Sequence, residues 1–172
     1  MNRPTISVAP LKWTQVMKFL FLRQAIESET DHLALDGDER KREPVWLAAG
    51  RMFVNRRWLQ ILVAKDGDRF VGYLSIFFAR FRKMKTNAYL VLSVREGYRG
   101  QGIGTRLMQE AEKLARERGI RRLELEVFAK NKQAYGLFKR LGYEEEGRKR
   151  QAVRVRDEFI DLVLMAKFLT KT

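Results

Sequence analysis

The chain has 172 residues, with 35 Lys and Arg against 21 Asp and Glu, a net charge of +14. This length suits a single domain over residues 1–172 with a real core. The absence of cysteine excludes disulfides and a covalent thiol intermediate, and one histidine, His32, argues against a protein-built metal site. No stretch reaches the length of a membrane span and no apolar signal region is present, so we expect a cytoplasmic protein. The net positive charge favours anionic partners. The alternative is that the basic residues are dispersed over a solvated surface and bind no partner.

The N-terminal part of the chain predicts a strand, a helix and a charged segment. We expect an edge strand over residues 5–9 and an amphipathic helix over residues 13–28. Residues 27–43 form an acidic segment in a basic protein, which contains Glu27, Glu29, Asp31, Asp36, Asp38, Glu39 and Glu43. This segment either attracts a cationic amine or is a charged surface loop. A second helix is predicted over residues 45–54.

The central part predicts an antiparallel meander of three strands, over residues 59–65, 69–81 and 88–94. Asp66-Gly67-Asp68 is typical of a hairpin turn between the first two strands. Gly72 marks a bulge or a close packing contact within the second strand. A basic turn precedes the third strand and contains Arg80, Arg82, Lys83 and Lys85.

The third strand enters a basic, glycine-rich turn that opens a helix over residues 103–118. The turn reads Val94-Arg95-Glu96-Gly97-Tyr98-Arg99-Gly100-Gln101-Gly102-Ile103-Gly104-Thr105. Glycines let a backbone approach a ligand and the first N–H groups of a helix are free, so the turn predicts a phosphate or pyrophosphate site. The Walker pattern is excluded because no Lys follows Gly104. The dinucleotide pattern GxGxxG is excluded because Leu107 stands where its last glycine would be.

Four further elements follow this helix. Leucine and valine alternate with glutamate and predict a half-buried strand over residues 123–127. A short helix then carries the pattern Asn131-x-x-Ala134-x-x-Leu137-Phe138-x-x-Leu141-Gly142-Tyr143. Two final strands are predicted over residues 150–155 and 159–165, around a polar turn.

These two motifs together resemble the signature of the GNAT N-acetyltransferase superfamily. The spacing Arg-x-x-Gly-x-Gly at Arg99, Gly102 and Gly104 is similar to its acetyl-coenzyme A pyrophosphate loop, and the Asn-x-x-Ala helix is similar to the second half of its signature. The resemblance implies an α+β fold, with a single mixed, mostly antiparallel sheet of about six to seven strands flanked by helices. It also implies direct transfer of an acetyl group from acetyl-coenzyme A to a primary amine in a ternary complex, and a possible homodimer.

The resemblance also assigns residues to coenzyme A. The pantetheine arm would pair with the strand that ends at Val94, and backbone N–H groups of the turn would hold the pyrophosphate. Asn131 is either a coenzyme A contact or the N-cap of its helix. The residues expected to bind coenzyme A are Leu92, Val94, Arg99, Gly100, Gln101, Gly102, Ile103, Gly104, Thr105, Asn131 and Phe138.

The catalytic groups depart from the family pattern. The tyrosine that often protonates the departing thiolate corresponds to Phe138, which has no proton to give, so Tyr135 is the substitute candidate and Tyr143 a further one. The strand that enters the turn carries no carboxylate, so Glu29 or Asp31 is the candidate base. No metal is expected.

The sequence does not identify which amine receives the acetyl group. A polyamine, an antibiotic, an amino acid and a protein N-terminus are all primary amines, and the run Glu146-Gly147-Arg148 resembles the ribosomal-protein and small-amine branch of these enzymes. The alternative function is a non-catalytic coenzyme A-binding module that engages RNA or a ribosome through its basic surface.

Overall fold

The computed structural model describes residues 6–30 and 57–169. Within these ranges seven strands form one sheet, in the order β1-β2-β3-β4-β5-β7-β6. The helix expected over residues 45–54, and Asp31, His32 and the rest of the acidic segment after Thr30, lie outside the described residues. Among the described helices there is none whose length and apolarity would let it span a lipid bilayer.

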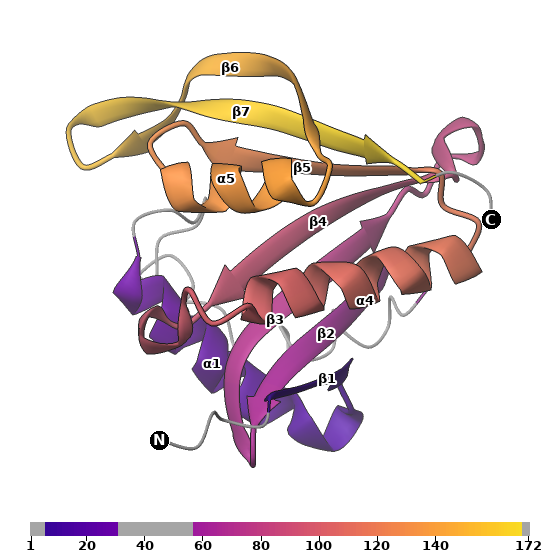
Figure 1. The fold of residues 1–172 in the computed structure, drawn as a ribbon, viewed down its shortest axis with the longest axis vertical. Helices are drawn as coiled ribbons and strands as arrows, with labels where there is room; N and C mark the ends of the chain where they lie inside the picture. The colour runs from indigo at the N-terminus through magenta and orange to yellow at the C-terminus, as the bar shows by residue number, and fades with distance from the viewer. Residues whose placement is uncertain (1–5, 31–56, 170–172) are drawn as a thin grey trace.

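Neighbouring strands are antiparallel except for β4 and β5, which run parallel (Figure 1). The sheet is therefore mixed and mostly antiparallel, and the predicted α+β fold is confirmed. The strands are β1 (Ile6–Pro10), β2 (Leu59–Asp66), β3 (Arg69–Phe78), β4 (Asn87–Val94), β5 (Arg122–Phe128), β6 (Glu144–Val155) and β7 (Glu158–Phe168).

Helices cover both faces of the sheet (Figure 1). α4 (Ile103–Glu117) and α5 (Lys132–Arg140) share a core cluster with one face, in which Leu107 and Met108 are fully buried. α1 (Val16–Glu29) lies on the other face, where Phe19 packs edge-on against Tyr73 with ring centroids 5.1 Å apart. The short turns are η1 (Trp13–Gln15), η2 (Arg82–Met84) and η3 (Glu96–Tyr98).

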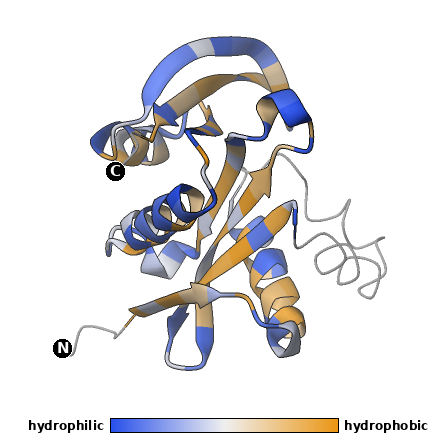
Figure 2. Ribbon diagram, turned by 90° about the vertical axis from the view of Figure 1, so that its right-hand side faces the viewer, coloured by the Kyte–Doolittle hydropathy of each residue, from blue (hydrophilic) through white to orange (hydrophobic). Residues whose placement is uncertain are grey.

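Three strand boundaries differ from the sequence prediction by three residues or more. β3 ends at Phe78 rather than at residue 81, β6 begins at Glu144 rather than at residue 150, and β7 ends at Phe168 rather than at residue 165. β6 is an edge strand with an exposed, hydrophilic sequence, so it lacks the apolar alternation that marks a half-buried strand (Figure 2). Its hydrogen bonds to β7 make it a strand, with register shifts between Glu145 and Gly147 and between Lys149 and Val153.

The structure confirms both a bulge and a close packing contact at Gly72. The β2–β3 register passes from Ala64 opposite Gly72 to Lys65 opposite Phe70, so Val71 is the extra residue of a bulge. A Cβ atom on Gly72 would lie 3.1 Å from the carbonyl oxygen of Ser93 on β4. This close approach brings β3 against the strand that leads to the glycine turn.

Candidate functional site

A gap opens in the sheet beside the second half of β4. The parallel pairing of β4 with β5 extends only over Asn87–Tyr89, after which the two strands separate. The N–H of Arg95 donates to the carbonyl of Val71 on β3, and backbone groups alternate sides along a strand. The N–H and C=O groups of Leu92 and Val94 therefore face the gap, where an extended ligand can pair with them.

The glycine turn joins β4 to α4 at the end of this gap. Gly100 and Gly102 have φ angles of 75° and 77°, a left-handed conformation that favours glycine. Gly102 is the N-cap of α4, and no side-chain hydrogen bond caps this helix start. The N–H groups of Ile103, Gly104 and Thr105 consequently remain available to an anion at the positive end of a fifteen-residue helix.

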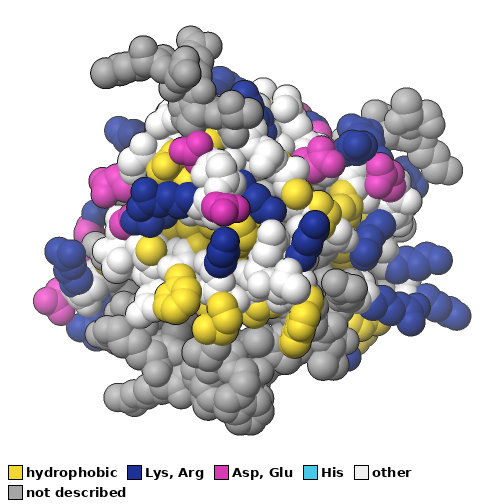
Figure 3. All heavy atoms as spheres, turned by 90° about the horizontal axis from the view of Figure 1, so that it is seen from below, with side chains coloured by type: hydrophobic (Ala, Val, Ile, Leu, Met, Phe, Trp, Pro, Cys, Tyr) yellow, Lys and Arg dark blue, Asp and Glu magenta, His cyan; other side chains and the backbone are white. Residues whose placement is uncertain are grey.

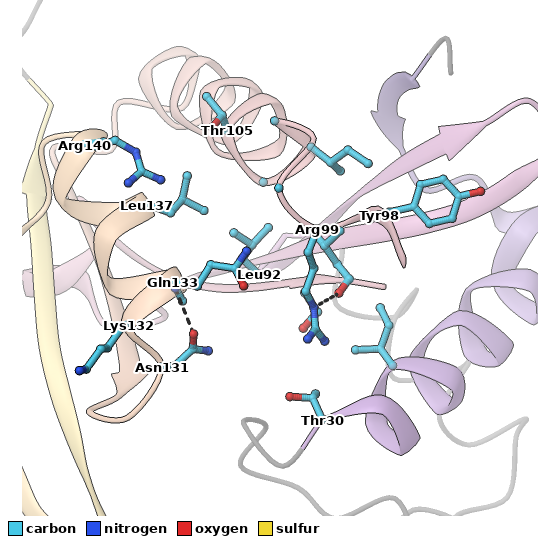
Figure 4. Close-up of a pocket in the computed structure, with 18 of the residues that line it drawn as sticks. Thr30, Leu92, Tyr98, Arg99, Thr105, Asn131, Lys132, Gln133, Leu137 and Arg140 are labelled. Carbon is cyan, nitrogen blue, oxygen red and sulfur yellow. Dashed lines mark hydrogen bonds between the residues drawn. The ribbon is translucent and has the colours of Figure 1, made fainter. Parts of the chain in front are cut away.

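Arg99 adds a full positive charge to the turn. Its Nε atom donates to the carbonyl oxygen of Val94 at 3.1 Å, which holds the side chain across the entrance to the gap. Figure 4 shows the guanidinium group of Arg99 directed into the cavity between α5 and α1. A guanidinium group in this position can bind a phosphate oxygen.

α5 forms the opposite wall of the cavity. The Asn131 side chain accepts a hydrogen bond from the N–H of Ala134 at 3.0 Å, so Asn131 is the N-cap of α5 and also lines the cavity (Figure 4). α4 and α5 approach closely at Gly104, where a Cβ atom would lie 2.9 Å from a methyl carbon of Leu137. Lys132 and Arg140 bring two further cations to the same wall.

The cavity between these walls has a volume of about 610 Å³, which suits a ligand larger than a simple anion. It brings together most of the residues that the sequence assigns to coenzyme A. Those that line it are Leu92, Val94, Arg99, Gly100, Gly102, Ile103, Gly104, Thr105 and Asn131.

Three predicted site residues lie outside the lining. Gln101 turns back, and its amide donates to the carbonyl of Gly97 at 3.1 Å. Phe138 is 6% exposed and packs beside Tyr143, which places it in the core. The hydroxyl of Tyr135 donates to Glu145 on β6 at 3.0 Å, and this hydrogen bond raises the pKa of Tyr135.

Glu29 is also outside the lining, because its carboxylate is already bound. It accepts hydrogen bonds from Arg95, at 2.8 and 2.5 Å, and from the N–H of Glu96 at 2.8 Å. Burial raises the pKa of Glu29, but these hydrogen bonds and the nearby Arg charges outweigh burial, so the pKa lies below its ordinary value of 4.5. Glu29 therefore fixes the end of α1 to the glycine turn, and its role as a base stays a prediction.

Replacing Glu29 with glutamine should destabilise the protein by about 1–3 kcal/mol at pH 7, because Arg95 loses a charge-assisted partner. A carboxyl group whose pKa is lowered on folding stabilises the protein above its unfolded pKa and loses that effect as the pH falls through its folded pKa. The difference between wild type and Glu29→Gln in chemical denaturation should thus close as the pH drops below 4.5.

The control for this prediction is Glu110→Gln, which removes an exposed carboxylate 3.8 Å from Lys113 on α4. Exposed ion pairs contribute little, so this variant should unfold like wild type at every pH. A Glu29→Gln protein that matches the control at pH 7 would contradict the anchoring role.

The sequence interpretation missed several residues of the α5 wall and part of the rim of the site. Gln133, Leu137 and Arg140 line the cavity and follow the helical spacing of one face of α5, a periodic signal that could have identified them. Ile26 and Thr30 at the end of α1 also line it, and no local motif indicates them.

Within residues 6–30 and 57–169, acidic, histidine and cysteine side chains form no group of three that could hold a metal.

A strand that separates from its parallel neighbour, beside an uncapped helix start, suits a long ligand that carries both amide groups and an anionic group. Comparison with known proteins identifies the family. The chain belongs to the acetyltransferase (GNAT) family, whose sequence model matches residues 22–143, more than half of its length.

One curated relative and two solved structures are similar to this chain in sequence and in fold, respectively. A candidate ribosomal protein bS18-alanine N-acetyltransferase of Bacillus subtilis (strain 168) is 34% identical over 87 residues, 51% of this chain and 54% of that protein. The match thus spans about half the length of this curated relative. A GNAT-family acetyltransferase of Streptococcus pneumoniae has the same fold, with a TM-score of 0.83, 23% identity, and coverage of 96% of this chain and 99% of that one. A Salmonella typhimurium structure that holds its cofactor acetyl-CoA has a TM-score of 0.77 and 17% identity, with coverage of 97% and 95%.

Proposed function

We propose that the protein is an N-acetyltransferase that moves an acetyl group from acetyl-coenzyme A to a primary amine. The observation that carries this proposal is the continuous cavity that runs from the backbone of Leu92 and Val94, which β5 leaves unpaired, to the uncapped start of α4. An extended, amide-containing arm fits the first part, and a pyrophosphate fits the second.

Different residues of the cavity would bind different parts of acetyl-coenzyme A. The N–H groups of Ile103, Gly104 and Thr105, together with the guanidinium group of Arg99, would hold the pyrophosphate. Lys132 and Arg140 on α5 supply positive charge for a further phosphate of the same ligand. The backbone near Val94 would hold the thioester carbonyl and stabilise negative charge that develops on its oxygen.

The acceptor would enter from the side of α1, where Ile26 and Thr30 line the cavity. Its neutral nitrogen attacks the carbonyl carbon and a C–N bond forms. The C–S bond then breaks, its electron pair leaves with the thiolate, and the proton released by the nitrogen passes to water. Positioning supplies much of the acceleration in such a direct transfer.

The Bacillus subtilis relative is named for an alanine of a ribosomal protein. We therefore include protein N-terminal amines, with small cationic amines and antibiotics, among the proposed acceptors.

The experiment is thiol release from acetyl-coenzyme A with a panel of amines: N-terminal peptides, polyamines and aminoglycosides. An acceptor-dependent increase, with an acetylated product of the expected mass, supports the proposal. Release at the same rate with and without every amine, by a protein that still binds acetyl-coenzyme A, would contradict it and favour the non-catalytic module.

Replacing Tyr135 with phenylalanine should change the turnover number by less than about threefold. The Tyr135 hydroxyl contacts Glu145 rather than the cavity, so it is not placed to protonate a leaving thiolate. A general acid contributes about 100-fold or more to a rate. A loss of that size in Tyr135→Phe, with a changed pH–rate profile, would restore Tyr135 as the acid.

A further inference from the structure

Four segments that are distant in sequence meet at one end of the sheet. The N–H of Phe78 donates to the carbonyl of Trp58 at 2.8 Å, which joins the start of β2 to the end of β3. The N–H of Arg121 donates to Thr86 at 2.8 Å, and the N–H of Leu169 donates to Arg121 at 2.8 Å. These bonds fix the β3–β4 turn, the segment after α4 and the end of β7 side by side.

We call the surface formed by residues 57–58, 79–86, 118–121 and 168–169 the basic–aromatic end. These segments contain basic residues but no Asp or Glu. The cations are Arg57, Arg80, Arg82, Lys83, Lys85, Arg118 and Arg121, and all are exposed. Figure 3 shows Lys and Arg side chains projecting at the right-hand margin, the side on which the β3–β4 turn and the end of α4 lie in Figure 1.

Exposed rings lie among these cations. Phe81 is 76% exposed and Phe168 is 68% exposed. The guanidinium group of Arg122 lies 5.2 Å from the ring centroid of Phe168, and Glu124 and Glu146 hold Arg122 in place. The guanidinium groups of Arg57 and Arg80 lie 5.2 and 5.9 Å from the ring centroid of Trp58. Flat cationic groups and rings are thus presented together at the surface.

The basic–aromatic end is separate from the cavity. It lies at the start of β4 and the end of α4, whereas the cavity lies at the end of β4 and the start of α4. The eight residues of β4 and the fifteen of α4 each span more than about 20 Å. The function of the basic–aromatic end therefore does not depend on whether the cavity binds coenzyme A.

We infer that the basic–aromatic end binds single-stranded RNA. Cations along a surface neutralise phosphates, and exposed aromatic rings and guanidinium planes stack on bases. Stacking requires bases that are not already stacked inside a duplex, and the loops and ends of RNA present such bases. An anionic membrane surface would also attract these cations, and the experiment below includes vesicles for that reason.

The test is fluorescence anisotropy of a labelled single-stranded RNA of about 15 nucleotides, a length that matches the site sizes of single-strand binders. Wild-type protein should bind this RNA with an affinity that falls as salt rises. The triple variant Arg82→Ala/Lys83→Ala/Lys85→Ala should reduce the magnitude of the salt slope by about 2, since each phosphate contact on a single strand contributes about 0.7. Phe81→Ala should weaken binding at least about fivefold at constant salt slope, because it removes one stacking ring.

The matched control is the triple variant Arg148→Ala/Arg150→Ala/Arg154→Ala on β6, which removes the same charge from another exposed surface. It should retain wild-type RNA affinity, and both triple variants should retain the melting shift with acetyl-coenzyme A. Equal loss of RNA binding in the two triple variants would overturn the inference. So would undetectable RNA binding, or binding to anionic phospholipid vesicles in its place.

Discussion

Replacing Gly102 with valine is expected to weaken acetyl-coenzyme A binding by about 100-fold or more while the protein stays folded. Gly102 has a φ angle of 77°, and L-residues pay about 1–2 kcal/mol in the left-handed region. A β-branched side chain will move the turn out of this conformation and shift the N–H groups that face the cavity. Two hydrogen bonds to a charged group, each about 1.5–3 kcal/mol, account for a loss of this size. Calorimetric titration measures it.

Gly119→Val is the matched control for this prediction. Gly119 follows the other end of α4, has a φ angle of 70°, and lies outside the cavity lining. The two variants should lose similar stability in thermal melting, but only Gly102→Val should lose acetyl-coenzyme A affinity. Equal affinity in Gly102→Val and Gly119→Val would contradict the role of the glycine turn.

Replacing Arg99 with methionine is expected to weaken acetyl-coenzyme A binding about 10- to 100-fold. The variant keeps the length of the side chain but removes one charge-assisted hydrogen bond to a phosphate, which is worth about 1.5–3 kcal/mol. It also frees the carbonyl of Val94, to which Arg99 donates. The measurement is again a calorimetric titration, in parallel with the Michaelis constant for acetyl-coenzyme A.

Two comparisons separate a phosphate contact from a general loss of charge. Arg106→Met removes an exposed guanidinium group from α4, outside the cavity, which contacts the carbonyl of Ile6, and it should leave the affinity unchanged. Acetyl-pantetheine has no pyrophosphate, so Arg99→Met and wild type should use it equally well. A variant that is impaired equally with both acetyl donors would show that Arg99 acts on the turn or the thioester rather than on the pyrophosphate.

The glycine turn and the individual strands could be predicted because their determinants are local. Gly100 and Gly102 occupy conformations that few other residues adopt. Continuous apolar runs mark β2 and β4, and alternating apolar residues mark β5. The Asn-x-x-Ala pattern likewise contains its own N-cap, Asn131, whose side chain accepts from Ala134. Such features depend on residues a few positions apart, which the sequence places next to each other.

The parts that were missed depend on residues that are far apart in sequence. Glu29 is fixed by Arg95, which lies 66 residues later, so a carboxylate that looked available as a base is already paired. Tyr135 donates to Glu145 on β6 and Phe138 packs beside Tyr143 in the core, so neither side chain lines the cavity. The early start of β6 depends on pairing with β7, not on its own composition. Cytoplasmic location, a homodimer and a single domain over residues 1–172 stay predictions.

The most direct test of the account is thermal melting of the wild-type protein with and without acetyl-coenzyme A. A ligand that binds only the folded state stabilises it by about 2.7 kcal/mol at 100 times its dissociation constant. For a protein of this size we expect the melting temperature to rise by about 5 °C or more, and by much less for Gly102→Val. No rise in wild type at millimolar acetyl-coenzyme A would mean that the glycine turn does not bind this ligand, and the proposed function would be wrong.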